Sequence, residues 1–301
     1  MHDGGLFLVV DNTTPQLSWN LFADIAAIFQ YQFMVNAFMA GTVVAIVAGA
    51  IGYFVVLRSS SFAAHALSHI GFAGATGAVV LAINPIFGLL AFTMGSGMAI
   101  GAFGDRIRGR DVTIGIVLAW TLGLGVLFIS LYTGYAQEAY ALLFGEILGI
   151  SVQEVAVTGL VAGVAVIALI AMYRPLLFAS VDQDLARAKG VPTLALSILF
   201  MALLALAVTD AVQVVGVLLI FALIVTPAAI AVRFTSRPSV AIATGIALSL
   251  SFTWLGLAIS YYSPHPVSFF ITSLAFGSYL VVRTAQALPG WFLRAGAAPT
   301  D

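Results

Sequence analysis

The sequence predicts an all-α, polytopic integral membrane protein with eight or nine transmembrane helices. Of its 301 residues, 62% are hydrophobic and only 8% are charged, and the mean hydropathy is +1.12. Soluble domains carry about 25% charged residues, and a soluble chain of this length could not bury so much apolar surface. The apolar residues also form segments close to the length of about 20 residues that a spanning helix needs.

Nine segments qualify as spans, although several are marginal in length. The breaks between them contain prolines, glycines or charged residues, which end apolar helices. The expected spans lie near 33–57, 64–83, 86–104, 112–131, 154–173, 193–209, 214–232, 239–260 and 267–284. The expected breaks are Arg58–Ser61, Asn84-Pro85, Gly104–Asp111, Tyr132–Glu138, Arg174–Pro192, Asp210–Gln213, Arg233–Pro238 and Ser263–Pro266.

The charges give the orientation. With nine spans, every basic residue falls on one side of the membrane, and the segments on the other side carry only acids, among them Asp24, Glu146 and Asp210. Basic residues mark cytoplasmic loops. The sequence therefore predicts an outside N-terminus, a cytoplasmic C-terminus and an acidic outer face that attracts cations.

The sequence predicts one membrane domain with a short segment at each terminus. We expect an extracytoplasmic N-terminal segment at 1–32, a transmembrane permease domain at 33–286 and a cytoplasmic tail at 287–301. Within the first segment, residues 17–32 are amphipathic and predict an interfacial helix. Residues 139–150 are apolar but too short to span, so they are expected to be re-entrant or to lie at the outer surface.

Composition excludes several functions. The chain has no cysteine, which removes disulfides, thiolate metal sites and cysteine nucleophiles. The net charge of −1 gives no sign of a nucleic-acid partner. The single lysine, Lys189, lacks the glycine and Ser/Thr neighbours of a phosphate-binding loop, so any ATP hydrolysis must come from another subunit. The N-terminus also lacks the basic region of a cleavable signal peptide.

Two histidines are the strongest candidates for chemistry. His65 and His69 lie at the cytoplasmic start of the second span, and their i, i+4 spacing stacks both imidazoles on one helix face. Two nitrogen donors so placed can reach one metal ion, and ionisable residues inside a membrane tend to be functional. The alternative is that both rings simply bind backbone carbonyls or water. A zinc protease is disfavoured because Ala66 occupies the position of the catalytic glutamate in H-E-x-x-H.

Three outer residues are further candidate metal ligands. His265 lies between two prolines at the mouth of the last two spans, where regular helix cannot form. Glu146 lies within the short apolar segment and Asp210 just before a span. Each has a plain alternative, as a solvated loop residue or, for Glu146, as a cap in a re-entrant turn.

The longest cytoplasmic connection, SVDQDLARAKGVP at 180–192, predicts a short helix on the membrane face. Asp182 can cap a helix over 183–189, which Gly190 would end. A helix of mixed charge in this position suits docking of a soluble partner, with Asp182, Asp184, Arg187 and Gly190 as candidate coupling residues, although it could also be an ordinary connection.

Four segments together resemble the metal-type (zinc, manganese, iron) ABC importer permeases. FVVLRSSSFAAHALSHIGFAG resembles the family's basic turn followed by D-A-L-S-H-A, and ALLFGEILGI its L-F-G-[DE]-L-L segment. VVGVLLIFALIVTPAAIAVRF resembles the V-G-x-L-L signature, and SVDQDLARAKGV is similar to the loop presented to the ATPase. The matches follow the family's order from about residue 35 to 284.

The resemblance implies fold and partners. It implies a type II ABC-importer permease fold, a homodimer with the translocation path at its interface, an ABC ATPase subunit and an extracytoplasmic metal-binding protein. The location would be the cytoplasmic membrane of a prokaryote. No cofactor would be bound permanently, because the divalent metal is the cargo.

Two departures from the family pattern bear on that cargo. His65 stands where the family usually has aspartate, and Pro264-His265 stands where an F-D-x-P motif is expected. Imidazole suits zinc whereas carboxylate suits manganese, so the sequence favours zinc. An ATP-independent metal carrier or channel and an ABC permease for a non-metal cargo are the alternatives.

Overall fold

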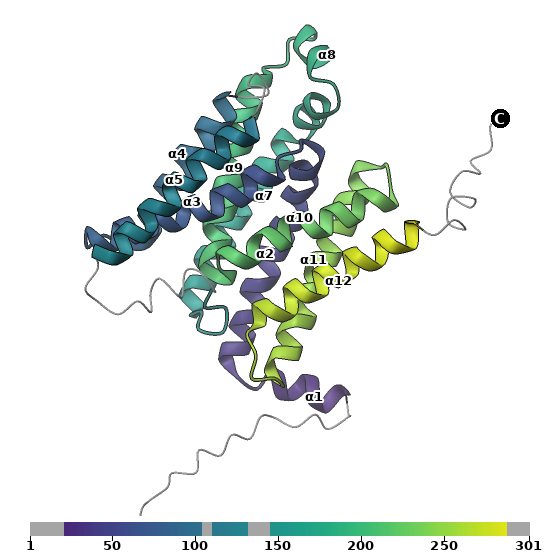
Figure 1. The fold of residues 1–301 in the computed structure, drawn as a ribbon. Helices are drawn as coiled ribbons and strands as arrows, with labels where there is room; N and C mark the ends of the chain where they lie inside the picture. The colour runs from purple at the N-terminus through teal and green to yellow at the C-terminus, as the bar shows by residue number, and fades with distance from the viewer. Residues whose placement is uncertain (1–20, 104–109, 132–144, 288–301) are drawn as a thin grey trace, which may run out of the picture.

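The computed structural model describes residues 21–103, 110–131 and 145–287 and confirms an all-helical membrane bundle (Figure 1). Eight of the described helices are long and apolar enough to cross a bilayer. The helices are α1 (Leu21–Ile28), α2 (Gln32–Leu57), α3 (Ser61–Val80), α4 (Pro85–Phe103), α5 (Arg110–Leu131), α7 (Val152–Val181), α8 (Gln183–Ala188), α9 (Thr193–Val215), α10 (Val217–Phe234), α11 (Pro238–Tyr261) and α12 (Val267–Ala287).

Among the long described helices, α3 is the one that those eight leave out. It has 20 residues, which is long enough to span, but its glycines, alanines, serines and two histidines make it less apolar than its neighbours. In the structure it lies inside the bundle, with 13 buried residues along its length. A helix of lower hydropathy is acceptable there because protein rather than lipid surrounds it.

The long helices alternate between two ends of the bundle, which we name the α8 end and the α1 end after the short helices found there (Figure 1). At the α8 end, the Arg58 guanidinium donates to the hydroxyls of Ser180 and Ser197, so the ends of α2 and α7 meet the start of α9. At the α1 end, the Asn36 amide donates to the Ile150 carbonyl at 3.0 Å, just before α7 begins. In the described residues, nine long helices cross the bundle in alternating directions (Figure 1), as the span pattern predicts.

Two helices form the centre, and others face outwards. In the most apolar windows of α2 and α9, 72% of residues are buried, against 17% in α5 and α12. Close approach to α2 depends on glycine: a Cβ on Gly49 would lie 2.6 Å from the Ile246 Cα, and a Cβ on Gly52 would overlap the Ile224 carbonyl oxygen. The exposed apolar side chains of α5 and α12 are the surface that lipid would cover.

Small residues also bring α3 against α4. A Cβ on Gly74 would overlap the Gly88 carbonyl oxygen, and one on Gly88 would overlap the Gly74 carbonyl oxygen. These backbones therefore touch, which is how helices pack closely in lipid. On its other sides α3 contacts α5, α9 and α10. The contact with α10 is the one that bears on the histidines.

Two expected breaks are wrong. Helix α7 continues through Pro175 to Val181 instead of ending at Arg174, because neighbouring helices support the backbone that proline leaves unpaired. Helix α9 continues through Asp210 and Gln213 to Val215, and the single residue Gly216, at φ +80°, joins it to α10. The polar residues that suggested a loop are instead packed inside the bundle: Asp210 is only 7% exposed.

The described parts of the two segments that were not expected to span lie at the α1 end. Of the amphipathic stretch 17–32, residues 21–28 form α1, which the Tyr262 hydroxyl holds by donating to the Asp24 carbonyl at 2.9 Å; residues 17–20 lie outside the described residues. Of the stretch 139–150, only 145–150 are described, and they form a turn rather than a helix. Gly145, at φ +77°, packs against Val215 and Gly216 where α9 meets α10.

Candidate metal centre and docking helix

His65 and His69 lie on one face of α3, and their rings touch. The ring centroids are 4.6 Å apart, with the planes at 77°. An ion held at about 2 Å by one nitrogen of each ring needs ring centres only a few ångströms apart, so small side-chain rotations would let both nitrogens reach one ion. Both side chains are half-buried. The expected pairing on one helix face is therefore present, and whether the pair binds metal stays a prediction.

The His65 ring is held by packing rather than by hydrogen bonds. It contacts the ring of Phe221 on α10, with centroids 5.0 Å apart and the ring planes at 66°. Its Nδ1 is buried and has no hydrogen-bond partner among the described residues. The nearby Ser68 hydroxyl is already engaged, because it donates to the His65 carbonyl at 2.8 Å. Permanent metal sites usually anchor the free nitrogen of a ligating histidine through a hydrogen bond, so this arrangement suits an ion that is held briefly.

In the described part of the chain, the pair has no third ligand within reach. Among residues 21–103, 110–131 and 145–287, no three His, Asp or Glu side chains come close enough to hold one ion. Two imidazoles with water, or with groups from another subunit, make a site that releases its ion readily. The contact of Phe221 with His65 could not be predicted from the sequence, because a phenylalanine in an apolar span carries no signal of its neighbours.

A second polar region lies at the α1 end, around a cavity of about 360 Å³. Its lining includes the exposed carboxylate of Glu146, together with Glu154, Thr158 and Gln213. Glu154 is engaged with its own helix: its carboxylate accepts from the Ser151 N–H at 2.8 Å, and its N–H bonds the Ser151 hydroxyl at 3.2 Å. That capping box starts α7 and binds one carboxylate oxygen of Glu154 to the backbone.

Asp210 lies behind this cavity and not in it. Its buried carboxylate hydrogen-bonds the Thr158 side chain, which also lines the 360 Å³ cavity. It borders a separate small cavity between α2, α9 and α10. The structure therefore places Asp210 in a helix beside the cavity at the α1 end, where the sequence had suggested an exposed connection.

His265 is exposed in the turn between α11 and α12, also at the α1 end. Its Nδ1 lies 2.8 Å from the Ser263 hydroxyl, and the Ser260 hydroxyl donates to its carbonyl at 3.1 Å. The absence of regular helix between the two prolines is confirmed. In the described part of the chain, no three-ligand group joins His265 to Glu146 or Asp210.

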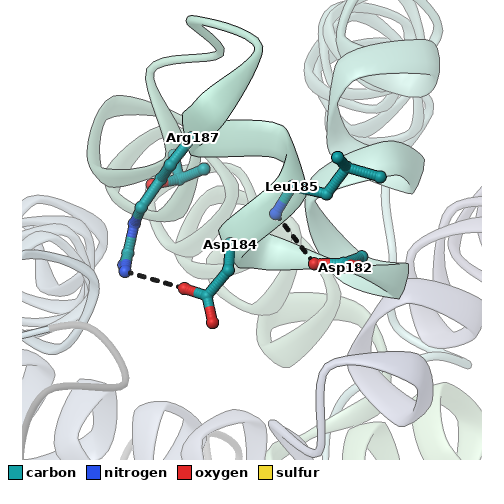
Figure 2. A network of polar contacts seen from close by, with 5 residues as sticks. Asp182, Asp184, Leu185 and Arg187 are labelled. Atoms are coloured by element: carbon teal, nitrogen blue, oxygen red, sulfur yellow. Dashed lines mark hydrogen bonds and ion pairs between the residues drawn. The ribbon is translucent and has the colours of Figure 1, made fainter.

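The short helix α8 forms as the sequence predicts, and Figure 2 shows its polar contacts. The Asp182 carboxylate accepts the Leu185 N–H at 2.9 Å, which caps the helix, and Gly190 at φ +81° follows its end. Asp184 and Arg187 form an ion pair at 3.6 Å (Figure 2), and the Asp184 side chain is 96% exposed. The apolar side of α8 is anchored by Ala186, which is fully buried among Ala179 and Leu196.

The sequence is similar to a known family of membrane transport proteins. A model of the family described as "ABC 3 transport family" matches residues 30–286. The manganese transport system membrane protein MntC of Listeria monocytogenes is 31% identical over 239 residues, which are 79% of this chain and 85% of that protein. The manganese import system permease protein ScaB of Streptococcus parasanguinis is 31% identical over 257 residues, covering 85% and 88% of the two chains.

A solved structure shares the architecture. A chain of PsaBC from Streptococcus pneumoniae in complex with Fab is similar with a TM-score of 0.77 and 29% identity, over 87% of this chain and 95% of that one. The similarity therefore extends over the helical bundle and is not confined to single motifs.

Proposed function

This chain belongs to the ABC 3 transport family, and from that premise we propose that it is the permease subunit of an ATP-driven importer of a divalent transition metal, with zinc as the favoured cargo. The observation that carries the proposal is the imidazole pair on α3, whose centroids are 4.6 Å apart inside a bundle of this family. An unanchored two-nitrogen site in a membrane path binds weakly enough to pass its ion on.

Two observations bear on the cargo and point in different directions. Two imidazoles favour zinc over manganese, which prefers oxygen ligands. The relatives MntC and ScaB are named for manganese, and an oxygen-lined cavity at the α1 end would accept that ion. We propose zinc because the half-buried pair of rings that can share one ion offers nitrogens, whereas the oxygens of Glu146 are exposed to water.

The partners follow from the ends of the bundle. A separate ABC ATPase subunit would dock on α8, where Asp184 and Arg187 are exposed and Ala186 anchors the helix. An extracytoplasmic metal-binding protein would deliver the ion at the α1 end, near Glu146 and His265. A second copy of the chain would complete the path beside α3 and α10, and the bilayer supplies lipid around the outer helices.

The orientation in the cytoplasmic membrane of a prokaryote follows the same logic. The described basic residues, such as Arg58, Arg187 and Arg233, lie at the α8 end, which would be cytoplasmic. The N-terminal segment 1–32 would be outside, the permease domain would cover 33–286, and the tail 287–301 would be cytoplasmic. The family match over 30–286 supports this division.

The residues would act in sequence from the α1 end to the α8 end. Glu146 would attract the ion at the outer cavity, and Asp210 would hold the wall of that cavity through Thr158. His65 and His69 would then take the ion transiently, with Phe221 keeping the His65 ring in place. ATP binding to the partner would move α8 and switch access to the path.

Metal uptake tests the proposal directly. Cells without their own zinc and manganese importers would receive this chain with its candidate ATPase and binding protein. We expect zinc uptake that the double variant His65→Ala/His69→Ala abolishes, at unchanged amounts of the variant in the membrane. Equal uptake of zinc and manganese would contradict the choice of zinc, and unchanged uptake by the double variant would make the histidines structural.

A second arm separates an importer from an ATP-independent carrier or channel. The same cells would carry an ATPase subunit that binds ATP but cannot hydrolyse it. We expect no uptake, because the chain has no ATP site of its own. Normal uptake with that subunit would favour the carrier, and uptake of a non-metal solute alone would favour a different cargo.

A further inference from the structure

Arg58 joins three helices at the α8 end of the bundle. It follows the last residue of α2, and its Nη1 and Nη2 donate to the hydroxyls of Ser180 on α7 and Ser197 on α9, at 3.3 and 2.7 Å. Its guanidinium carbon also lies 5.5 Å from the centre of the Phe200 ring. A planar guanidinium that binds two acceptors and a ring is fixed in direction as well as position.

The two serines belong to the same unit as α8. Ser180 lies in the last turn of α7, and Ser197 lies near the start of α9. Between them, the Arg187 Nε donates to the Thr193 hydroxyl at 3.0 Å, and the buried Ala186 packs against Ala179 and Leu196. The end of α7, α8 and the start of α9 are therefore held together, and Arg58 binds this unit on both sides of α8.

On its other side, Arg58 is three residues from the helix that carries the histidines. The turn is tight: Ser59 has φ +51°, the Ser60 N–H bonds the Val55 carbonyl at 2.8 Å, and Ser60 is 2% exposed. The Ser60 hydroxyl also donates to the Arg58 carbonyl at 3.2 Å. Because α3 begins at Ser61, a displacement of Arg58 is passed to α3 with little room for the turn to absorb it.

We propose that Arg58 is a positioning residue that transmits movement of α8 to α3, and so shifts His65 relative to Phe221 on α10. This inference rests on the proposed function and adds the connection between the docking helix and the histidine pair. The network is contiguous from Arg187 through Thr193, Ser197 and Arg58 to the first turn of α3. Contiguity alone is not coupling, so the test must measure coupling.

Arg233 provides a matched control. It also lies at the α8 end of its helix, donates to one side chain, Gln286 at 3.0 Å, and lies 5.7 Å from the centre of an aromatic ring, Tyr279. Both of these contacts are to α12 and not to α8 or α3. Removing either guanidinium breaks contacts of the same kinds, a side-chain hydrogen bond and a ring contact, but only Arg58 connects the docking helix to the histidines.

The experiment compares Arg58→Gln with Arg233→Gln in the full complex, in liposomes, with the ATPase and the binding protein present. Metal uptake per ATP hydrolysed is the readout. We expect Arg58→Gln to lower this ratio by about tenfold, within the range of ordinary coupling between sites, while Arg233→Gln keeps it. The double variant Ser180→Ala/Ser197→Ala, which leaves the arginine in place, should lower the ratio in the same direction and covers the case in which Arg58→Gln does not fold.

A second readout does not depend on the cargo. Because the chain has no cysteine, Phe62→Cys in the first turn of α3 provides a single thiol whose labelling rate reports movement of that helix. We expect ATP to change this rate with Arg58 present, and the change to disappear with Arg58→Gln but not with Arg233→Gln. Equal uptake ratios for the two glutamine variants, or an ATP-dependent rate that survives Arg58→Gln, would overturn the proposal.

The two readouts separate this inference from the proposed function. If the complex moves no metal but the ATP-dependent labelling still requires Arg58, the cargo assignment fails and the connection stands. If metal is transported normally by Arg58→Gln with an unchanged uptake ratio, the connection fails and the importer stands.

Discussion

The acidic cavity at the α1 end and the histidine pair on α3 are both candidate cation sites, but their environments differ. At the α1 end, Glu146 is exposed beside a cavity of about 360 Å³, and the neighbouring carboxylate of Glu154 is already bound to backbone. On α3, His65 and His69 are half-buried, and His65 is packed against Phe221. A wet oxygen site attracts any divalent ion, whereas a packed nitrogen pair can discriminate between ions. Under the proposed function, the cavity at the α1 end would collect divalent cations, and the histidine pair on α3 would select among them.

The largest effect should come from the single variants His65→Ala and His69→Ala. Because the two histidines hold one ion together, losing either should lower zinc uptake at least about tenfold. Loss of a residue that only supports a metal ligand already lowers metal affinity or activity by about that factor. The double variant should be hardly worse than either single one, since the two residues act as a unit. Independent, additive losses in a double-mutant cycle would mean that the histidines do not share an ion.

Asp210→Asn should have the next largest effect. Asparagine keeps the size and can still bind Thr158, so the helix should fold, but the carboxylate beside the cavity at the α1 end is lost. We expect uptake to fall about fivefold, equivalent to roughly 1 kcal/mol. Asp210→Ala should also reduce the amount of protein in the membrane, because it leaves a buried hydroxyl without its partner. Normal uptake by Asp210→Asn at normal protein levels would make this residue structural.

Glu146→Gln should have a smaller effect that depends on conditions. An exposed charge attracts ions weakly, so we expect the metal concentration for half-maximal uptake to rise about two- to threefold, with an unchanged maximal rate. High salt should remove the difference by screening. Glu154→Gln is the matched control, because glutamine also completes a capping box. An equal effect of both substitutions would refute a specific role for Glu146.

His265→Ala should have the smallest effect. The side chain is exposed, and its Nδ1 is engaged with the Ser263 hydroxyl at 2.8 Å, so we expect zinc uptake to change by less than about twofold, as for other surface substitutions. A loss as large as that of His65→Ala would instead make His265 an obligatory ligand at the α1 end. Zinc uptake in the two variants, measured at matched protein levels, decides between these outcomes.

Much of the fold could be predicted because its signals are local. The apolar segments predicted the positions of all nine long helices, and Asp182 and Gly190 predicted the ends of α8. Prolines marked the breaks at Asn84-Pro85 and at 262–266. In each case the cause lies within a few residues of its effect: side-chain hydropathy, a missing N–H or a capping carboxylate.

What could not be predicted depends on contacts between distant segments. Asp210 reads as a loop residue, because in sequence a polar residue that ends an apolar run looks the same whether water or protein surrounds it. Phe221 carries no mark of the imidazole it touches, and Arg58 looks like an ordinary basic residue at a helix end.

The sequence by itself therefore determined that the chain is a bundle of membrane helices, where most of them begin and end, and which two histidines share a helix face. Only the tertiary structure decided that Asp210 is buried in α9, that Phe221 packs on His65 and that Arg58 binds both helices that flank α8. The physical reason is that helix formation in lipid is dictated by local hydropathy and backbone hydrogen bonds, whereas side-chain partners are chosen when helices far apart in the chain pack together.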